Sequence, residues 1–461
     1  MLRPDDITAF GKPPRISNLK VTVLGLARSG MAVSRLLKER GCRVFVSDGA
    51  ENAALRTAAE ELSALGIPSE LGGHTGRALE CDFLVRSPGV PNSNPILAQA
   101  RRQGMAVVSE IEAAFWFCPA QVAAITGSNG KTTTTQWLGD VIRRSGRKVA
   151  VCGNVGHPFS AAIADLDANA IAVLEVSSFQ LEDIHLFSPR AAVMTNLSPD
   201  HLDRYDDYDA YIRAKCRIFE KMTPDAALIY NRADDELTRR ALRASCRKLS
   251  FGRNRPPAAG AGVEGADLIL HNGEQSRRLL KVGEIALPGR HNLENALAVA
   301  SAAADLRIGD WPIAESLRKF AGVPHRLETV LESKGILWVN DSKATNIASG
   351  LVGLQSFQRP IILLAGGRDK GSDFASIADE VAQLVRRVIL FGEAGALIEK
   401  AWTREMDLQR VGSLHEAVNM AASLAQPQDV VLLSPMCASF DEFKNYEDRG
   451  EQFKIWVKEH A

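Results

Sequence analysis

The chain has 461 residues, enough for two to four domains at ~100–200 residues each. Hydrophobic residues make up 46% and charged residues 24%, as in ordinary globular proteins, and no apolar run is long enough to span a bilayer. Because 55 basic and 55 acidic residues balance to a formal charge of +0, no overall positive field exists to attract nucleic acid or anionic lipid.

The seven cysteines are scattered along the chain and form no Cys-x-x-Cys pair. That pattern is typical of free thiols in a reducing compartment, so we expect a cytoplasmic protein. Residues 1–18 hold three prolines and no apolar signal core. We interpret them as a largely extended N-terminal tail and not as a targeting segment.

The first predicted domain covers residues 19–110 and opens with a nucleotide-binding pattern. An apolar strand leads into the turn Gly25-Leu-Ala-Arg-Ser-Gly30, a helical pattern over residues 31–40 and a second strand that ends at Asp48. This order matches the βαβ fingerprint in which an acidic residue accepts a hydrogen bond from a ribose or base. Because Ala27 replaces the middle glycine, a tight turn without a ligand is the alternative.

The second predicted domain, residues 111–322, carries a phosphate-binding pattern. An apolar run from Val122 ends in Thr126-Gly-Ser-Asn-Gly-Lys-Thr-Thr133, and a helical pattern follows from Thr134. Backbone N–H groups of such a turn and of the helix N-terminus point at an anion, the lysine adds positive charge, and a threonine hydroxyl can bind Mg²⁺. Ile125 stands where the usual loop has its first glycine, so a plain strand-to-helix turn with an exposed lysine is the alternative.

Two further apolar runs in this domain end in polar residues. Residues 170–174 are followed by Glu175, and residues 191–196 lead to His201. Both are typical of buried parallel strands, whose carboxyl ends share one edge of a sheet, so both side chains are expected near the phosphate loop, where they could serve Mg²⁺. A helix N-terminal acid and a turn histidine are the alternatives. The glycine-rich residues 253–286 indicate a small β meander or a surface excursion.

The third predicted domain, residues 323–461, contains further apolar runs that end in glycine or polar residues: 336–339, 360–364, 388–391 and 430–433. Alternation of such strands with helical stretches is typical of doubly wound sheets. We therefore predict an α/β fold of three domains: an N-terminal Rossmann-like domain, a central P-loop-type ATPase sheet and a C-terminal Rossmann-like domain. The boundary before the third domain, at residues 320–324, is the expected hinge.

A series of motifs stands in a fixed order along the chain. They are Thr126–Thr132, Gly153–Gly156, Glu175–Leu181, Asp200–Arg204, Ala214–Lys215, Gly289–Asn292 with Asn295, Pro324–Arg326, Asn340–Asn346 and Leu433–Pro435. Together they resemble the Mur ligases, the ATP-dependent amino-acid-adding enzymes of peptidoglycan synthesis. Within that family, residues 177–182, 341–346 and 437–445 are most similar to the branch that adds glutamate. The resemblance runs from about Leu19 to the C-terminus.

The resemblance implies an activity and its cofactors. The carboxylate of UDP-N-acetylmuramoyl-L-alanine would attack the γ-phosphate of ATP, the amine of glutamate would attack the resulting acyl phosphate, and ADP and phosphate would leave. The cofactors would be ATP and Mg²⁺, and two Mg²⁺ ions are expected. The protein would act as a monomer, with no nucleic-acid or membrane partner. D-glutamate is the expected substrate, although the sequence alone does not separate enantiomers that carry the same charges.

The same resemblance implies catalytic and metal-binding residues. The catalytic residues would be Lys131, His201 and Lys215. The metal ligands would be Thr132, Thr133, Glu175, His201 and Lys215. Lys215 matches a lysine that the family carries as a carbamate, an anion suited to a metal site. An ordinary surface lysine on a helix over residues 208–221 is the alternative.

Substrate contacts follow from the resemblance as well. ATP would be bound by Gly127, Ser128, Asn129, Gly130, Lys131, Thr132, Thr133, Asn292, Asn295, Arg326, Asp341 and Lys343. The UDP substrate would be bound by Arg28, Ser29, Asp48, Gly49, Gly73, Ser87, Asn154 and His201. Glutamate would be bound by Thr345, Lys370, Ser439 and Phe440. Arg28 departs from the apolar residue usual in the family, and residues 340–346 could instead be a hydrophilic strand-exit loop.

Three other functions compete with this one. The first-domain turn alone would suit a nicotinamide-dependent oxidoreductase, and the phosphate loop alone would suit an NTPase switch or scaffold. An oxidoreductase leaves Lys131 and Glu175 without a role, and a switch leaves Lys370 and Ser439 without one. A related ligase, adding L-glutamate or resembling folylpolyglutamate synthetase, is the nearest alternative.

Overall fold

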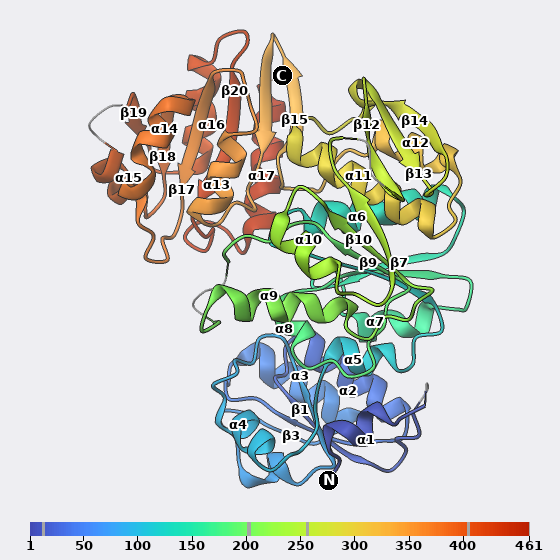
Figure 1. Ribbon diagram of the computed structural model, residues 1–461. Helices are drawn as coiled ribbons and strands as arrows, with labels where there is room; N and C mark the ends of the chain where they lie inside the picture. The colour runs from blue at the N-terminus through green and yellow to red at the C-terminus, as the bar shows by residue number, and fades with distance from the viewer. Residues whose placement is uncertain (12–13, 201–203, 255–257, 403–405, 461) are drawn as a thin grey trace. The chain divides into compact units, whose positions relative to one another are not determined.

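The computed structural model describes residues 1–461 except 12–13, 201–203, 255–257, 403–405 and 461 (Figure 1). The predicted site residue His201 therefore lies outside the described residues. The chain forms two compact units, Met1–Phe320 and Ala321–Ala461. In the described residues three sheets carry helices on their faces, which confirms the predicted α/β class.

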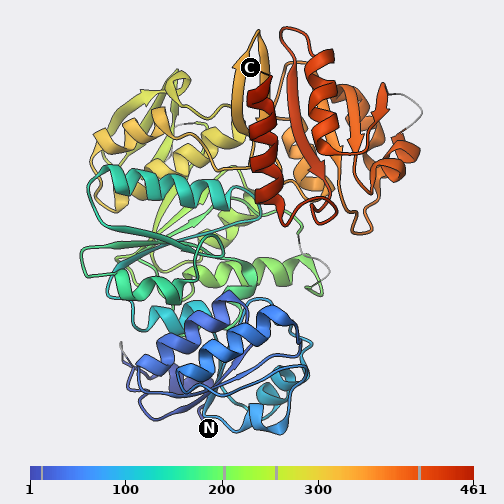
Figure 2. The same cartoon turned by 180° about the vertical axis from the view of Figure 1, so that it is seen from behind.

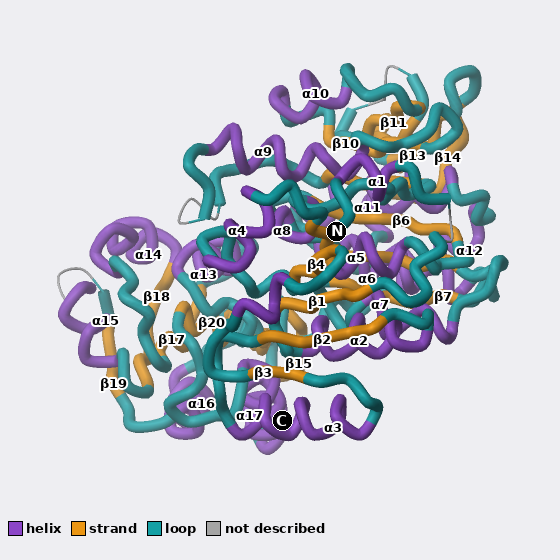
Figure 3. The backbone as a smooth tube through the Cα atoms, turned by 90° about the horizontal axis from the view of Figure 1, so that it is seen from below, coloured by secondary structure: helices purple, strands orange, loops and turns teal. Residues whose placement is uncertain are grey.

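The first sheet has the order β3-β2-β1-β4-β5, and each adjacent pair of these described strands is parallel. Figure 3 shows β3, β2, β1 and β4 side by side in this order. The strands are β1 (Lys20–Leu24), β2 (Arg43–Ser47), β3 (Ser69–Glu70), β4 (Phe83–Arg86) and β5 (Val107–Ser109). Helices α2, α3 and α5 pack on one face, and α4 with the short helix η1 packs on the other. These helices are α2 (Arg28–Glu39), α3 (Ala53–Ala64), α4 (Pro95–Arg102), α5 (Glu110–Phe115) and η1 (Gly76–Leu79).

The start of the chain is not the extended tail that its prolines suggested. Residues Pro4–Thr8 form the short helix α1, with the proline in the first turn, where it costs no hydrogen bond. Ile7 is completely buried against the first sheet. The backbone of Leu2 pairs with Asp82 at 2.6 Å and with Ala106 at 2.8 Å. The extended interpretation was wrong because these apolar residues gain burial by packing on the sheet.

The second sheet follows the order β14-β13-β12-β11-β10-β9-β6-β8-β7 in the described residues. Strands β6 to β11 pair in parallel, and β12, β13 and β14 continue the sheet as an antiparallel meander. The strands are β6 (Gln121–Thr126), β7 (Val149–Gly153), β8 (Ile171–Glu175), β9 (Ala191–Met194), β10 (Ala227–Asn231), β11 (Arg247–Phe251), β12 (Gly260–Glu264), β13 (Asp267–His271) and β14 (Ser276–Lys281). Residues 253–286 thus contain the predicted meander.

Helices cover both faces of the second sheet (Figures 1 and 2). Helices α6, α11 and α12 pack together on one face, and α7, α8, α9 and α10 lie on the other. The helices are α6 (Lys131–Arg144), α7 (Phe159–Ala162), η2 (Ile163–Asp165), α8 (Ser178–Leu181), α9 (Tyr208–Cys216), η3 (Arg217–Phe219), α10 (Asp235–Ala241), η4 (Val282–Glu284), α11 (Arg290–Asp305) and α12 (Asp310–Lys319). Because β6 lies between β8 and β9, the loops after these three strands meet at one edge.

The second unit contains one sheet with the order β15-β16-β20-β17-β18-β19 in its described residues. The strands are β15 (Glu328–Ser333), β16 (Ile336–Asn340), β17 (Ile361–Gly366), β18 (Val385–Phe391), β19 (Leu408–Arg410) and β20 (Val430–Met436). Only β15 runs antiparallel to its described neighbour, so the carboxyl ends of β16, β20 and β17 meet.

The helices of this unit form two layers around its sheet. They are α13 (Ile347–Leu354), η5 (Phe374–Ile377), α14 (Ala378–Leu384), α15 (Gly395–Trp402), α16 (Leu414–Leu424) and α17 (Tyr446–Glu459). Helices α13 to α15 contribute to the core on one face, and α16 and α17 to the core on the other. In the described parts of the whole chain, no helix has both the length and the apolar character needed to cross a membrane.

Candidate active site

The turn between β6 and α6 depends on two glycines. Gly127 and Gly130 have φ angles of 148° and 80°, which other residues rarely adopt. A Cβ atom on Gly127 would lie 1.9 Å from Thr195 Oγ1, and one on Gly130 would lie 2.5 Å from Asn295 Oδ1. The backbone therefore enters α6 in a tight turn that no side chain could occupy.

Lys131 begins α6 and folds back over this turn. Its Nζ donates to the carbonyl oxygens of Gly127 at 2.8 Å and Ser128 at 2.7 Å. The next two residues, Thr132 and Thr133, are buried in the first turn of the helix. The residues predicted to cradle phosphate thus lie together at a helix N-terminus, where free N–H groups favour an anion.

The N-terminal turn of α11 lies against the same loop. Thr134 donates through Oγ1 to Asn295 Oδ1 at 3.2 Å, although 161 residues separate the two. Asn295 in turn donates to Asn292 Oδ1 at 3.4 Å. Of the two asparagines that the resemblance assigned to the nucleotide, Asn295 therefore lies next to the phosphate loop, and Asn292 is hydrogen-bonded to it.

Glu175, the last residue of β8, presents a buried carboxylate beside this loop. Its Oε1 accepts from Asn154 Nδ2 at 2.8 Å, whereas Oε2 is buried with no hydrogen-bond partner among the described residues. A buried carboxylate oxygen needs a donor or a cation, so this oxygen fits a metal ligand. The described residues contain no group of three or more His, Cys, Asp or Glu side chains arranged for a metal. The other metal ligands expected near Glu175 are threonine hydroxyls and Lys215.

Lys215 on α9 is buried and points at the phosphate loop. Its side chain donates to the carbonyl oxygen of Gly127 at 2.8 Å, the same oxygen that accepts from Lys131. Its Nζ lies 4.6 Å from the centre of the Tyr211 ring. Burial, reinforced by the charge of Lys131, lowers the pKa of Lys215 well below its usual value. This burial excludes the alternative of an ordinary surface lysine.

A cavity of about 560 Å³ opens between the first sheet and the loops after β7 and β8. Six predicted contacts of the UDP substrate line it: Arg28, Ser29, Asp48, Gly49, Ser87 and Asn154. Gly73 does not line this cavity in the described structure, but its N–H donates to the carbonyl of Asp48 at 3.4 Å. The Asp48 carboxylate accepts from the N–H groups of Leu26 at 2.7 Å and Ala50 at 2.9 Å, so it also holds its own turn.

Three cavity residues with polar side chains were not among the predicted contacts: His74, Asn94 and Gln180. His74 Nδ1 lies 2.6 Å from Ser47 Oγ, and its Nε2 lies 3.0 Å from Asn94 Nδ2. His74 and Asn94 lie in loops without a recognised motif, whereas Gln180 lies within the motif Glu175–Leu181 but was not assigned to the substrate. A usable signal was present for His74, because it closely follows the carboxyl end of β3, the place where ligands bind in such sheets.

The second unit has its own polar cluster where β16, β20 and β17 end. Backbone pairs join the following loops: Arg368 with Ala438 at 2.8 and 2.9 Å, and Met436 with Ala344 at 2.9 Å. These pairs bring together the loops that carry the predicted residues Asp341, Lys343, Thr345, Lys370, Ser439 and Phe440. Ser439 is buried, whereas Lys370 and Phe440 are exposed.

Arg449 on α17 was also missed by the sequence reasoning, and it holds two of these loops. Its guanidinium is buried and donates to the carbonyl oxygens of Ser342 at 2.8 Å, Cys437 at 3.1 Å and Ala438 at 3.2 Å. A lone arginine on the inner face of an amphipathic helix was the available signal. The hydrogen bonds of Arg449 fix the backbone next to Ser439.

Asp341 is buried directly after β16. Burial raises the pKa of its carboxyl to about 7, against the opposing charge of Arg326 and the hydrogen bonds from Ser434 and the Leu327 N–H. The folded chain therefore binds more protons than the unfolded chain between pH 4 and pH 7, and stability falls as the pH rises through that range.

We expect Asp341→Asn to remove this pH dependence. The wild-type second unit should lose on the order of 4 kcal/mol of unfolding free energy between pH 4 and pH 8 through this group, because each pH unit is worth ~1.4 kcal/mol. Denaturant unfolding of both proteins across that range is the measurement. Parallel profiles for the two would contradict the expectation.

Comparisons with known proteins agree with this arrangement. Residues 19–109 match the model "Mur ligase MurD-like, N-terminal domain", residues 125–303 match "Mur ligase middle domain", and residues 325–437 match "Mur ligase, glutamate ligase domain". The protein is 44% identical to the UDP-N-acetylmuramoylalanine–D-glutamate ligase of Salinibacter ruber, with 97% of this chain and 99% of the relative covered. It is 42% identical to the enzyme of that name from Acidobacterium capsulatum, with 96% of each chain covered.

Solved structures show the same fold at lower identity. UDP-N-acetylmuramate-alanine ligase MurC from Thermotoga maritima has a TM-score of 0.59 and 19% identity, covering 96% of this chain and 100% of that one. MurF from Acinetobacter baumannii has a TM-score of 0.59 and 16% identity, covering 95% and 93%. The matches to the three family models and to the near-full-length relatives show that this chain belongs to the Mur ligase family.

Proposed function

We propose that this protein catalyses the ATP-dependent addition of D-glutamate to UDP-N-acetylmuramoyl-L-alanine in peptidoglycan precursor synthesis. The names of its near-full-length relatives support the choice of substrate and enantiomer. The structural observation that best supports this function is the position of Asn154. Asn154 lines the cavity and also donates a hydrogen bond to Glu175 beside the phosphate loop. A substrate held in that cavity would extend toward the bound ATP.

Phosphate release tests this function directly. The protein should release phosphate from ATP when UDP-N-acetylmuramoyl-L-alanine and D-glutamate are both present, and much less with L-glutamate. Equal rates with the two enantiomers would argue for a less selective ligase. Family membership argues against the oxidoreductase and the NTPase switch, since neither would form an amide bond.

Each part of the chain has a proposed task. Residues 19–110 would bind the UDP substrate, residues 111–322 would bind ATP, and residues 323–461 would bind glutamate. Before them, Ile7 and Ile16 pack on the first sheet. In the first unit, Asn292 and Asn295 would contact the nucleotide. In the second unit, Arg326, Asp341 and Lys343 would contact the nucleotide, and Thr345, Lys370, Ser439 and the Phe440 backbone would hold the glutamate carboxylates.

The chemistry follows from charge. When the substrate carboxylate attacks the γ-phosphate, ADP leaves and negative charge gathers on the transferring group, which the loop N–H groups and the Lys131 ammonium would stabilise. In this structure Lys131 donates to two loop carbonyls, and phosphate oxygens would replace those acceptors. The amine of glutamate then attacks the acyl phosphate carbonyl, and phosphate leaves.

The metal site is supported by the orphaned Oε2 of Glu175. Thr132, Thr133 and Glu175 would hold Mg²⁺, together with a modified Lys215 and with His201, which lies outside the described residues. Bound Mg²⁺ would neutralise charge on the transferring phosphoryl group. The lowered pKa of Lys215 supports the modification, because only an unprotonated amine can attack CO₂ and lose a proton to form a carbamate.

We further propose a cytoplasmic monomer. All seven cysteines lie in the described residues and none forms a disulfide there, as a reducing compartment would keep them. Light scattering on the purified protein tests the oligomeric state.

We expect Asp48→Asn to raise the KM for UDP-N-acetylmuramoyl-L-alanine at least ~tenfold, because one charged acceptor at the cavity is lost. Asp82→Asn is the matched control, since Asp82 also accepts a backbone N–H on the first sheet but does not line the cavity in the described structure. Calorimetric titration of the whole protein should show binding of the UDP substrate and none of NAD. Binding of NAD alone would reverse the assignment.

The glutamate site yields a second prediction. Loss of a hydrogen bond to a charged group costs ~1.5–3 kcal/mol, so Lys370→Ala and Ser439→Ala should each raise the KM for glutamate at least ~tenfold with little change in the KM for ATP. Lys400→Ala, another exposed lysine of the same unit, is the control. Equal increases in both KM values would show that these residues support the fold or the nucleotide site instead.

A further inference from the structure

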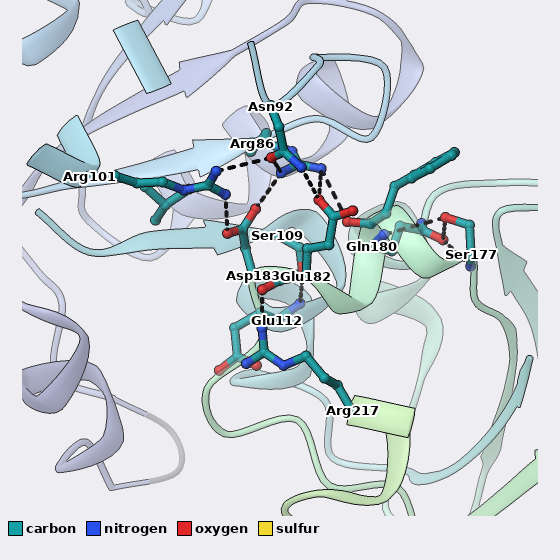
Figure 4. A network of polar contacts seen from close by, with 12 residues as sticks. Arg86, Asn92, Arg101, Ser109, Glu112, Ser177, Gln180, Glu182, Asp183 and Arg217 are labelled. Atoms are coloured by element: carbon teal, nitrogen blue, oxygen red, sulfur yellow. Dashed lines mark hydrogen bonds and ion pairs between the residues drawn. The ribbon is translucent and has the colours of Figure 1, made fainter. Parts of the chain in front are cut away.

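Arg86, the last residue of β4, is a buried charge in an otherwise apolar strand. Its side chain is only 1% exposed. The guanidinium donates to Glu182 Oε2 at 2.8 Å, Asp183 Oδ2 at 2.9 Å and Asn92 Oδ1 at 2.7 Å (Figure 4). Burial alone would raise the pKa of the Glu182 carboxyl, but the neighbouring Tyr205 hydroxyl and the charge of Arg86 hold it below its usual value. Arg86 and Glu182 therefore form an ionised pair, because a charge as deeply buried as that of Arg86 needs an opposite charge beside it.

A second layer of contacts fixes the two carboxylates. Arg101 on α4 donates to Asp183 Oδ1 at 2.8 Å, and Asn92 donates to Glu182 Oε2 at 3.0 Å. Arg217 donates to the backbone carbonyl of Glu182 from below in Figure 4. These residues and Arg86 form one ion-pair network, which joins the first sheet to the segment after α8 across about a hundred residues of sequence.

The network connects two walls of the 560 Å³ cavity. Ser87, which directly follows Arg86, lines the cavity and donates through Oγ to the carbonyl of Gly25 at 2.9 Å. Gln180 on α8 lines it from the side of the second sheet, and its Oε1 accepts from the N–H of Ser177 at 3.0 Å and from its Oγ at 3.1 Å. Arg86 does not itself line the cavity in the described structure. Its influence on a ligand would run through these neighbours.

We propose that Arg86 is a positioning residue for the UDP substrate, which sets the Ser87 wall of the cavity at a fixed separation from the Gln180 wall. This inference rests on the proposed assignment of the cavity to that substrate. One ligand must satisfy both walls at once, so walls held in place before binding save the cost of ordering them. Without Arg86, the Glu182 and Asp183 carboxylates lose their shared cation, and the α8 side of the cavity is free to shift.

The test uses Arg86→Met in the full-length protein, because methionine keeps an unbranched apolar stem and removes only the guanidinium. Arg190→Met is the matched control: Arg190 pairs with the buried Asp305 at 3.0 Å in the same unit, away from the cavity. Both variants should lower the Tm. Only Arg86→Met should raise the KM for UDP-N-acetylmuramoyl-L-alanine, by at least tenfold, with the KM for ATP changed less than twofold. Arg86→Lys, which keeps one cation for two carboxylates, should recover part of the loss.

An unchanged substrate KM in folded Arg86→Met would overturn the inference and leave Arg86 as a purely stabilising residue. If Arg86→Met fails to fold, Glu182→Gln takes its place, with an expected rise of at least threefold and the same overturning result. The Asp48→Asn variant tests separately whether the cavity binds the UDP substrate, which is the assignment on which the role of Arg86 rests. A raised KM in Asp48→Asn with an unchanged KM in Arg86→Met would overturn the role of Arg86 alone. Unchanged values in both would overturn the cavity assignment, and the role of Arg86 with it.

Discussion

Replacement of Lys131 by alanine is expected to lower ATP-dependent ligation at least ~10³-fold, because the substitution removes positive charge from the transferring phosphates. The loop itself should keep its shape. Gly127 and Gly130 set the turn, and the Thr195 hydroxyl holds it by donating to the carbonyl of Asn129 at 2.5 Å. Steady-state phosphate release with saturating substrates measures the loss, and thermal unfolding reports whether the fold is intact.

Lys148→Ala is the matched control for this substitution. Lys148 is an exposed lysine of the same unit whose ion pair with Asp167 at 3.4 Å is solvent-accessible and contributes little. It should leave turnover unchanged. Near-normal turnover in folded Lys131→Ala would remove the phosphate loop from the mechanism.

Replacement of Lys215 by alanine should be nearly as damaging, and for a different reason. The proposed carbamate would supply an anion at the metal site, so its loss would deprive Mg²⁺ of one of its proposed ligands. Short carboxylates such as formate or acetate are small enough to enter the space that the side chain leaves and to restore that anion. We therefore expect Lys215→Ala to lose most of its activity and to regain part of it as the carboxylate concentration rises.

Lys131→Ala provides the control for this rescue. That variant has lost a cation, so an added carboxylate should not restore it. Full activity of Lys215→Ala without any additive would contradict the carbamate role. Equal rescue of both variants would show that the carboxylate acts elsewhere.

Local patterns predicted much of the phosphate loop. The strand, the glycines, the lysine and the following helix occupy one continuous stretch, and each depends on neighbouring residues only. The predicted helix began at Thr134, whereas α6 begins at Lys131. The first turn of a helix has N–H groups without intrahelical partners and shows little apolar periodicity, so its start is difficult to place from sequence.

Long-range pairing decided which polar residues meet. Asn295 reaches Thr134 because α11 packs against α6. In the second unit, β20 is last in the chain but lies between β16 and β17, and this order brings Ser439 beside the loop of Lys370. Strand order follows from the packing of whole layers, so no local pattern contains it.

Local sequence patterns were enough to predict the α/β class, the apolar strands and the polar or glycine residues at their carboxyl ends, because hydrophobic period and turn chemistry are properties of adjacent residues. The burial of Lys215, the folding of Pro4–Thr8 into α1 and the interior positions of Arg86 and Arg449 depend instead on long-range packing. A charged side chain is exposed unless partners far away in sequence neutralise it. Those partners are brought to it only when the sheets and helices pack.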